Sequence, residues 1–253
     1  MRRSLIILFI LVSLPASLCA TEDPDSLFKA GSELYNKGDH AGALELWQEI
    51  ADEGLYSPAL YYNMGNAAFK IGKTAHSILW YEKALLMKPF DEDIRYNLEI
   101  ARSYVTDRFD TIPELFVIRW FRMISLVLDS NGWAVIAVML FALCLVLLLL
   151  WLFSGKPGVK RLTLTATVFS FALALSALGL YHGNRRVTIK KRAAVILTPA
   201  ETGMSSPGTG GKELFVIHEG TKVKIEEEAG EWIRIRLPDG NVGWITSGSV
   251  GKI

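Results

Sequence analysis

The longest hydrophobic runs of this chain lie in its middle and contain no charged residue. They are Trp133–Phe153 and Leu162–Tyr181, and residues 154–161 separate them. A helix of about 20 residues spans about 30 Å, the thickness of the hydrocarbon core of a bilayer. We therefore expect two transmembrane helices joined by a short cytoplasmic loop, a hairpin that returns the chain to the side from which it entered.

A shorter hydrophobic run near the start of the chain predicts export. Leu5–Leu14 follows Arg2 and Arg3 and precedes small residues that end at Ala20. A basic start, a short apolar stretch and a small-residue end are typical of a signal peptide, which we expect at residues 1–20. Together with the hairpin, this signal predicts a bacterial inner-membrane protein with two spans and with both soluble domains in the periplasm.

The basic residues beside the spans give conflicting indications of topology. Lys156, Lys160 and Arg161 lie in the predicted loop, in agreement with the positive-inside preference. Five basic residues between Arg185 and Arg192 follow the second span, and the same topology places them outside. The number of spans after an export signal favours the periplasmic placement, whereas this basic cluster favours the reverse.

The segment between the signal and the first span repeats itself with a period of 34 residues. At this shift Gly38 falls on Gly72, and Trp47 falls on Tyr81. Glycine is common just after the end of a helix, so each repeat predicts two helices joined by a tight turn. This period and these glycine and aromatic positions resemble the tetratricopeptide repeat, in which helix–turn–helix units stack on one another.

The same register divides the helical region, residues 21–104. The repeats occupy residues 24–57 and 58–91, and helical spacing at residues 92–104 predicts a helix that caps the stack. The region carries eight Lys and Arg residues against fourteen Asp and Glu residues. Nucleic acid, which attracts basic surfaces, is therefore not an expected partner.

A stack of this type has a concave face that holds an extended peptide or a partner helix. The repeat register places these candidate residues on that face: Tyr35, Tyr62, Asn66, Phe69, Lys70 and Tyr96. Polar groups beside an aromatic ring, as at Tyr62 and Asn66, suit a binding surface. For Tyr35 and Phe69, packing between the repeats is an equally good interpretation.

The linker at residues 105–132 contains an amphipathic pattern that begins at Pro113. Arg119, Arg122 and Ser125 fall on one stripe of a helix, and bulky apolar residues cover the rest. This pattern is typical of a helix that lies in the membrane interface, with Trp120 at the level of the headgroups. Continuation of the helical stack is the alternative.

After the second span the pattern changes to a period of two, which predicts short strands separated by glycine-rich turns. The predicted strands are Ala193–Leu197, Leu214–His218, Lys222–Glu226, Trp232–Leu237 and Asn241–Ile245, and residues 198–212 predict a loop. Short strands in this number suggest a small all-β barrel. Their motifs, such as the Trp after Gly-Glu and the Trp after Val-Gly, resemble a bacterial SH3-type domain over most of residues 190–253, and we expect this domain to occupy residues 182–253.

Three aromatic residues of this domain are candidates for a binding surface: Trp232, Trp244 and Phe215. Bacterial SH3-type domains bind peptides or cell-wall fragments, so peptidoglycan is one expected ligand. The two tryptophans also belong to the pattern of the fold itself, and structural packing is the competing interpretation.

The complete order of segments resembles the BatE-type proteins of the Bacteroides aerotolerance operon. The fold class we expect is a multidomain membrane protein with all-α tetratricopeptide repeats, a two-helix transmembrane hairpin and a C-terminal all-β SH3-like barrel. The resemblance implies membrane proteins with von Willebrand A domains as partners, beside the lipid bilayer. It also implies a role in tolerance of oxygen or envelope stress.

No residue pattern predicts an enzyme. The sequence has no Gly-rich phosphate loop, its four histidines and two cysteines lack metal-ligand spacing, and no Ser or Cys stands in a nucleophile motif. We expect neither a cofactor nor a metal. The expected function is a non-enzymatic scaffold that binds partner proteins in the repeat groove. The alternative is a cell-wall sensor or anchor that acts through the SH3-type domain.

Overall fold

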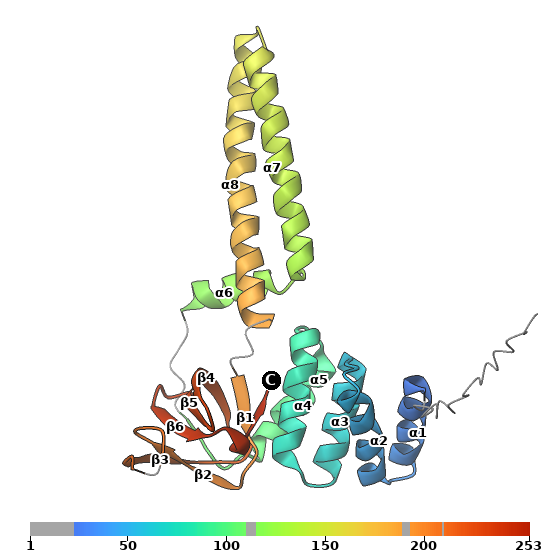
Figure 1. Ribbon diagram of the computed structural model, residues 1–253. Helices are drawn as coiled ribbons and strands as arrows, with labels where there is room; N and C mark the ends of the chain where they lie inside the picture. Colours follow the sequence, from blue (N-terminus) through green and yellow to red (C-terminus); the bar gives the residue numbers. More distant parts are fainter. Residues whose placement is uncertain (1–22, 110–114, 189–192, 209) are drawn as a thin grey trace, which may run out of the picture.

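The computed structural model describes residues 23–109, 115–188, 193–208 and 210–253. It contains a row of helices, a long helical hairpin and an antiparallel sheet, and the row and the sheet lie side by side at the same end of the hairpin (Figure 1). The predicted signal peptide lies outside the described residues. So do Pro113 and the basic residues Lys190, Lys191 and Arg192.

The row of helices is built from two antiparallel pairs and a fifth helix. The helices are α1 (Pro24–Asn36), α2 (His40–Asp52), α3 (Pro58–Lys70), α4 (Thr74–Met87) and α5 (Glu92–Ser103). Side chains cap several of them, because Asp39, Ser57 and Asp91 accept hydrogen bonds from backbone N–H groups at the starts of α2, α3 and α5. Each pair turns at a glycine with positive φ, Gly38 at 87° and Gly72 at 78°.

The two pairs are packed in the same way, which explains their 34-residue period. Gly31 of α1 lies against the ring of Trp47 on α2, and Gly65 of α3 lies against the ring of Tyr81 on α4. A Cβ atom added to either glycine would stand 2.6 Å from that ring. Glycine is therefore required at both positions for the helices to approach this closely.

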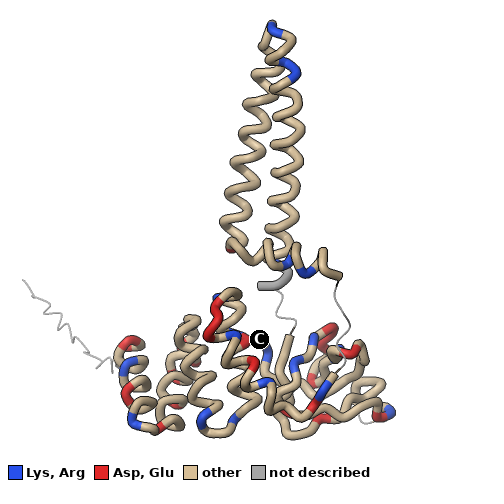
Figure 2. The backbone as a smooth tube through the Cα atoms, turned by 180° about the vertical axis from the view of Figure 1, so that it is seen from behind, with Lys and Arg blue, Asp and Glu red and all other residues tan. Residues whose placement is uncertain are grey.

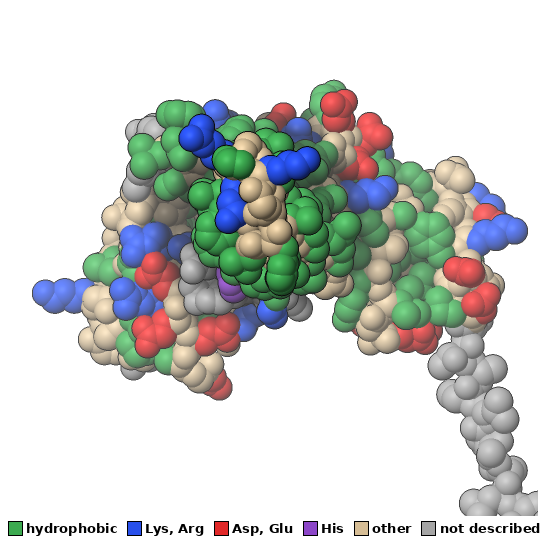
Figure 3. Space-filling view, turned by 90° about the horizontal axis from the view of Figure 1, so that it is seen from above, with side chains coloured by type: hydrophobic (Ala, Val, Ile, Leu, Met, Phe, Trp, Pro, Cys, Tyr) green, Lys and Arg blue, Asp and Glu red, His purple; other side chains and the backbone are tan. Residues whose placement is uncertain are grey.

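The hairpin consists of α7 (Ser130–Phe153) and α8 (Pro157–Thr188). Both are long and apolar enough to cross a membrane, and only 6% of the most apolar part of α7 is buried inside the protein. Figure 3, which looks down on the tip of the hairpin, shows the hydrophobic side chains that surround both helices. Charged residues gather at the two ends of the hairpin (Figure 2).

Small residues of α8 form the contact with α7. The buried residues Thr163, Thr167, Ser170, Ala174 and Ala177 recur every three or four positions and so share one face of the helix. Their size lets the two backbones approach, and the Ser170 hydroxyl donates a hydrogen bond of 2.8 Å to the carbonyl oxygen of Leu140 on α7.

The ends of α8 differ from the predicted ends. The loop of the hairpin comprises residues 154–156 rather than 154–161, because α8 begins at Pro157, a residue favoured in the first turn of a helix. Lys160 and Arg161 therefore belong to the helix. At its other end α8 continues to Thr188, so residues 182–188 are helical and the prediction that the β domain starts at residue 182 is wrong. A change in hydrophobicity marks where a helix leaves apolar surroundings, not where it ends.

A short helix, α6 (Phe116–Ser125), lies across the base of the hairpin (Figure 1). It packs on α8 and not on the row of helices, so the linker does not continue the helical stack. The indole N–H of Trp133 donates to the carbonyl oxygen of Ser125 at 3.0 Å. The side-chain amide of Asn184 donates to the carbonyl oxygens of Ser125 and Leu128, each at 3.0 Å.

The C-terminal sheet has seven antiparallel strands in the order β3-β2-β6-β5-β4-β1-β7. The strands are β1 (Ala193–Ile196), β2 (Ala200–Met204), β3 (Glu213–His218), β4 (Lys222–Ala229), β5 (Trp232–Arg236), β6 (Val242–Thr246) and β7 (Val250–Lys252). Its core is rich in isoleucine and includes Ile217, Ile233, Ile235 and Ile245, all buried. One residue of the linker, Phe109, also packs against this core.

Strands β2 and β7 were not predicted, and the predicted loop at residues 198–212 contains β2. Its sequence, Ala-Glu-Thr-Gly-Met, has no alternation of apolar and polar residues. Gly203 pairs with Phe215 of β3, whose ring covers it. The strand is thus defined by its neighbours rather than by its own side chains.

Candidate functional site

The candidate groove residues converge on one pocket in the row of helices. It has a volume of about 300 Å³ and is lined by residues of α1, α3, α4 and α5. The lining residues are Tyr35, Asn66, Phe69, Lys70, Tyr81, Asn97 and Ile100. We call this the groove pocket. It contains four of the six residues that the repeat register places on the concave face.

A hydrogen-bond network forms the floor of the groove pocket. The side-chain carbonyl of Asn66 accepts a hydrogen bond of 2.6 Å from the Tyr81 hydroxyl and one of 3.1 Å from the Asn97 amide. The same Asn97 amide donates to the Tyr62 hydroxyl at 2.9 Å. The amide N–H groups of Asn66 have no acceptor among the described residues, so they are available to a ligand.

Burial raises the pKa of Tyr81 well above its usual value; Ser77 opposes this rise, and weaker repulsion from Tyr62 and Tyr35 adds to it. Burial also raises the pKa of Tyr35. Both hydroxyls therefore keep their protons at any physiological pH. The pocket presents hydroxyl and amide groups together with a single cation, that of Lys70.

Tyr35 and Phe69 both pack between helices and line the groove pocket, as the two interpretations of these residues require. The Tyr35 ring lies 4.6 Å from the ring of His40 and 6.0 Å from that of Trp47, measured between centroids. Phe69 meets the ring of Tyr104 edge-on at 5.5 Å. Both side chains hold helices together, and both also form walls of the groove pocket.

Tyr96 does not line the groove pocket, and its place on the concave face stays a prediction. Its side chain is 66% exposed, whereas Asn97 and Ile100 of the same helix line the pocket. Neighbouring positions differ by about 100° around a helix, so a shift of one residue moves a side chain to another face. The repeat register could not set the rotation of α5, because no complete third pair follows to extend it.

In the sheet, the three candidate aromatic residues separate onto two faces. Trp232 and Trp244 alternate with the buried Ile233 and Ile245, so they lie together on the outer face of β5 and β6. Phe215 is on the other face, where its ring packs over Gly203 and Gly243 and against the core. A single surface made of all three residues is therefore excluded.

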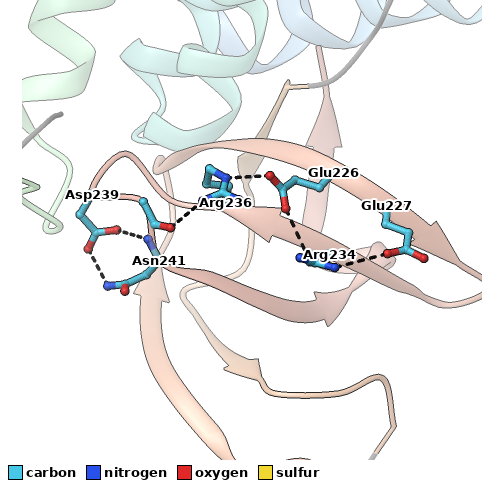
Figure 4. A network of polar contacts seen from close by, with 7 residues as sticks. Glu226, Glu227, Arg234, Arg236, Asp239 and Asn241 are labelled. Atoms are coloured by element: carbon cyan, nitrogen blue, oxygen red, sulfur yellow. Dashed lines mark hydrogen bonds and ion pairs between the residues drawn. The ribbon is translucent and has the colours of Figure 1, made fainter. Parts of the chain in front are cut away.

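The outer face beside the tryptophans carries charges that are already paired (Figure 4). Arg236 donates to Glu226 at 2.7 Å, and Arg234, which is opposite Trp244 in register, lies 3.5 Å from Glu226 and 3.6 Å from Glu227. The hydrogen bond from Arg236 lowers the pKa of Glu226. Asp239 and Asn241 close the adjacent turn through two hydrogen bonds of 2.9 Å. The tryptophans thus share their face of the sheet with charges that already have partners.

The helices and the sheet also meet in a junction that sequence analysis did not find. Val195 of β1 and Ile253 belong to the hydrophobic core of the helical row. Gly220, in the turn between β3 and β4, lies against Val105 and Ile78, and Gly251 of β7 lies against Leu79 of α4. A Cβ atom added to these glycines would stand 2.7 Å from Val105 and 2.5 Å from Leu79. Val195 and Ile253 thus pack into the core of the helical row, while the sheet keeps a separate core of its own.

Two carboxylates fasten this junction. Glu82 of α4, only 4% exposed, accepts hydrogen bonds from Arg102 of α5 and from Lys222 of β4, the latter at 2.6 Å. Asp107 accepts from the backbone N–H of His218 at 2.7 Å and from the Thr221 hydroxyl at 2.6 Å. Its other oxygen lies 2.7 Å from Nδ1 of His218. No short-range pattern joins these residues, because their partners are distant in the sequence.

In the described part of the chain, no group of three or more His, Cys, Asp or Glu side chains is placed so that it could hold a metal ion. Cys144, the cysteine of α7, is buried and free.

Comparison with known proteins identifies the C-terminal part of the chain. A search of curated proteins gave no match. A family model described as the bacterial SH3 domain matches residues 205–251, from just after β2 into β7, and so includes Phe215, Trp232 and Trp244. Residues 205–251 are thus a bacterial SH3 domain.

Proposed function

We propose that this protein is a membrane-anchored scaffold that binds an extended segment of a partner protein in the groove pocket. The observation that carries the proposal is the chemistry of that pocket. Aromatic walls, the free amide N–H groups of Asn66 and the cation of Lys70 together suit a peptide backbone and an acidic or C-terminal group. The helix pairs would then be tetratricopeptide repeats.

The arrangement of the chain supports the anchoring role. The two long apolar helices return to one side, and the helical row and the SH3 domain both lie there (Figure 1). With the export signal expected at residues 1–20, that side is the periplasm of a bacterium. The resemblance to BatE-type proteins further suggests membrane proteins with von Willebrand A domains as partners, and a role in oxygen or envelope stress.

Replacing Lys70 by glutamate is expected to abolish capture of the partner without unfolding the protein. Lys70 is exposed and lines the groove pocket, so reversing its charge repels an acidic segment and disturbs no core contact. The measurement is crosslinking in intact cells, followed by purification in detergent and identification of the captured proteins. Reversal of Lys29, exposed on α1 outside the pocket, is the matched control. Equal capture by both variants would contradict the proposal.

A second candidate function is anchoring to the cell wall, favoured by the match to a bacterial SH3 domain and by the two tryptophans on its outer face. Under this proposal, replacing Trp232 and Trp244 together by alanine lowers retention of the full-length protein on purified peptidoglycan by at least about tenfold, because aromatic faces dominate such contacts. Replacing the exposed Val216 of β3 by alanine is the control. Retention that is unchanged in the double variant rejects wall binding at this face.

A further inference from the structure

The base of the hairpin has a defined level, which α6 marks. The hydrogen bonds of Trp133 and Asn184 fasten the end of α6 to α7 and α8. Several large apolar side chains of α6 are exposed, among them Phe116, Ile118 and Trp120. With the hairpin inserted in a bilayer, as the proposed function requires, α6 lies at the level of the headgroups.

The turn between α4 and α5 reaches the same level. Residues Leu86–Asp91 of this turn form one wall of a pocket of about 580 Å³, and Leu126–Ser130 together with Asn184 form the other. Two apolar side chains of the turn, Met87 and Phe90, are 46% and 50% exposed. The helical row thus presents apolar side chains toward the membrane surface at the point where it comes nearest to the hairpin.

The polar lining of this pocket is zwitterionic. It contains the ammonium group of Lys88 and the carboxylates of Asp91 and Asp129, beside seven apolar side chains. Each carboxylate uses one oxygen to cap a helix: Asp91 accepts from the N–H of Ile94 at 3.2 Å, and Asp129 from that of Gly132 at 2.8 Å. Lys88 stays 3.9 Å from the second oxygen of Asp91, longer than a hydrogen bond.

We propose that this pocket binds the headgroup of an aminophospholipid and so seats the helical row on the bilayer. The primary ammonium of the lipid contacts Asp129 and Asp91, its phosphate contacts Lys88, and its acyl chains run beside α6 and α7. A headgroup with one cation and one anion complements a pocket with both. Met87 and Phe90 enter the interface, where apolar side chains are removed from water.

This contact would determine how the groove pocket faces the membrane. Val195 and Ile253 pack into the core of the helical row, and Lys222 of β4 donates to Glu82 of α4, so a lipid held by the α4–α5 turn would orient the row and the sheet together. A partner segment would then be bound at a fixed height and direction relative to the bilayer.

Site-specific quenching tests the seat on the bilayer. In the full-length protein with both native cysteines replaced by alanine, a fluorophore is attached at Phe90→Cys and the protein is placed in vesicles that contain lipid spin-labelled at the headgroup. We expect strong quenching. The control is Lys73→Cys, exposed at the opposite end of α4, about 20 Å away for a helix of this length. A label at Met139→Cys in the middle of α7, quenched by chain-labelled lipid, verifies insertion separately.

Lipid retention tests the headgroup. Native mass spectrometry of protein taken from nanodiscs of equal phosphatidylethanolamine and phosphatidylcholine content is expected to show retained phosphatidylethanolamine. The double variant Lys88→Gln with Asp129→Asn, in which Asn keeps the helix cap, should lose this retention about tenfold. The exposed pair Lys37→Gln with Glu99→Gln should leave it unchanged. Equal retention of both lipids, equal retention by both double variants, or equal quenching at residues 90 and 73 would each overturn the proposal.

Discussion

Replacing Glu82 by lysine is expected to destabilise the soluble part of the protein by at least about 3 kcal/mol. Glu82 is 4% exposed and is the common partner of Arg102 and Lys222. A lysine there would bury a third cation beside two others, with no anion to balance them. Arg102 and Lys222 are 45% and 41% exposed and can turn toward water, which keeps the expected effect at the lower end of the range for buried pairs.

Chemical denaturation of the full-length protein in detergent measures this effect. Reversal of Glu49, an exposed residue of α2, is the matched control and should change stability by less than about 0.5 kcal/mol. Adding Lys222→Glu to the Glu82 variant should restore part of the loss, because it supplies an anion from the sheet. If the Glu82 and Glu49 variants denatured alike, the junction would not contribute to stability.

Replacing Asp107 by asparagine is expected to cost about 1–3 kcal/mol at neutral pH and to make stability less sensitive to acid. Burial alone would raise the pKa of Asp107, but hydrogen bonds from Thr221 and from the backbone and ring of His218 outweigh it and lower the pKa below its usual value. An asparagine has one acceptor oxygen in place of two, so it cannot satisfy these donors.

The pH dependence follows from the direction of this shift. Because the pKa is lower in the folded than in the unfolded protein, ionised Asp107 stabilises the fold above its unfolded value of about 4. That contribution is lost as the pH falls through the folded pKa. The difference in melting temperature between wild type and Asp107→Asn should therefore be large at pH 7 and shrink below about pH 4. A difference in melting temperature that stays constant with pH would contradict this prediction. Asp93→Asn, a change at an exposed residue of α5, is the control.

Glu82 and Asp107 connect the two regions of the soluble part. The sequence patterns divide it into a repeat region and an SH3-type domain. Val195 and Ile253 of the sheet instead complete the core of the helical row, and Glu82 and Asp107 hold the boundary.

Patterns with a short period predicted their elements well. The helix pairs follow from glycine and aromatic spacing, since Gly31 must face Trp47 as Gly65 faces Tyr81. The strands with alternating side chains, such as β5, follow from the same kind of local rule. Strand β2 has no such alternation, and it exists because the ring of Phe215 covers Gly203.

Part of the groove pocket follows from the repeat register, and two candidate residues lie elsewhere for different reasons. Asn66, Phe69 and Lys70 line the groove pocket as the repeat register requires. Tyr96 does not, because the rotation of α5 depends on its packing against α4 rather than on the repeat. Phe215 was grouped with the tryptophans because all are aromatic, although strand pairing turns it to the core.

By itself, the sequence determined the local elements: two apolar helices long enough to span a bilayer, paired helices with a period of 34 residues, and short alternating strands. These depend on neighbours within a few residues, which the chain order specifies directly. Only the tertiary structure decided that Asn97 rather than Tyr96 enters the groove pocket and that α6 is fastened to the hairpin by Trp133 and Asn184. It also decided that Val195 and Ile253 pack into the core of the helical row. Those contacts join residues far apart in the sequence, and they arise from shape and charge complementarity that no local pattern encodes.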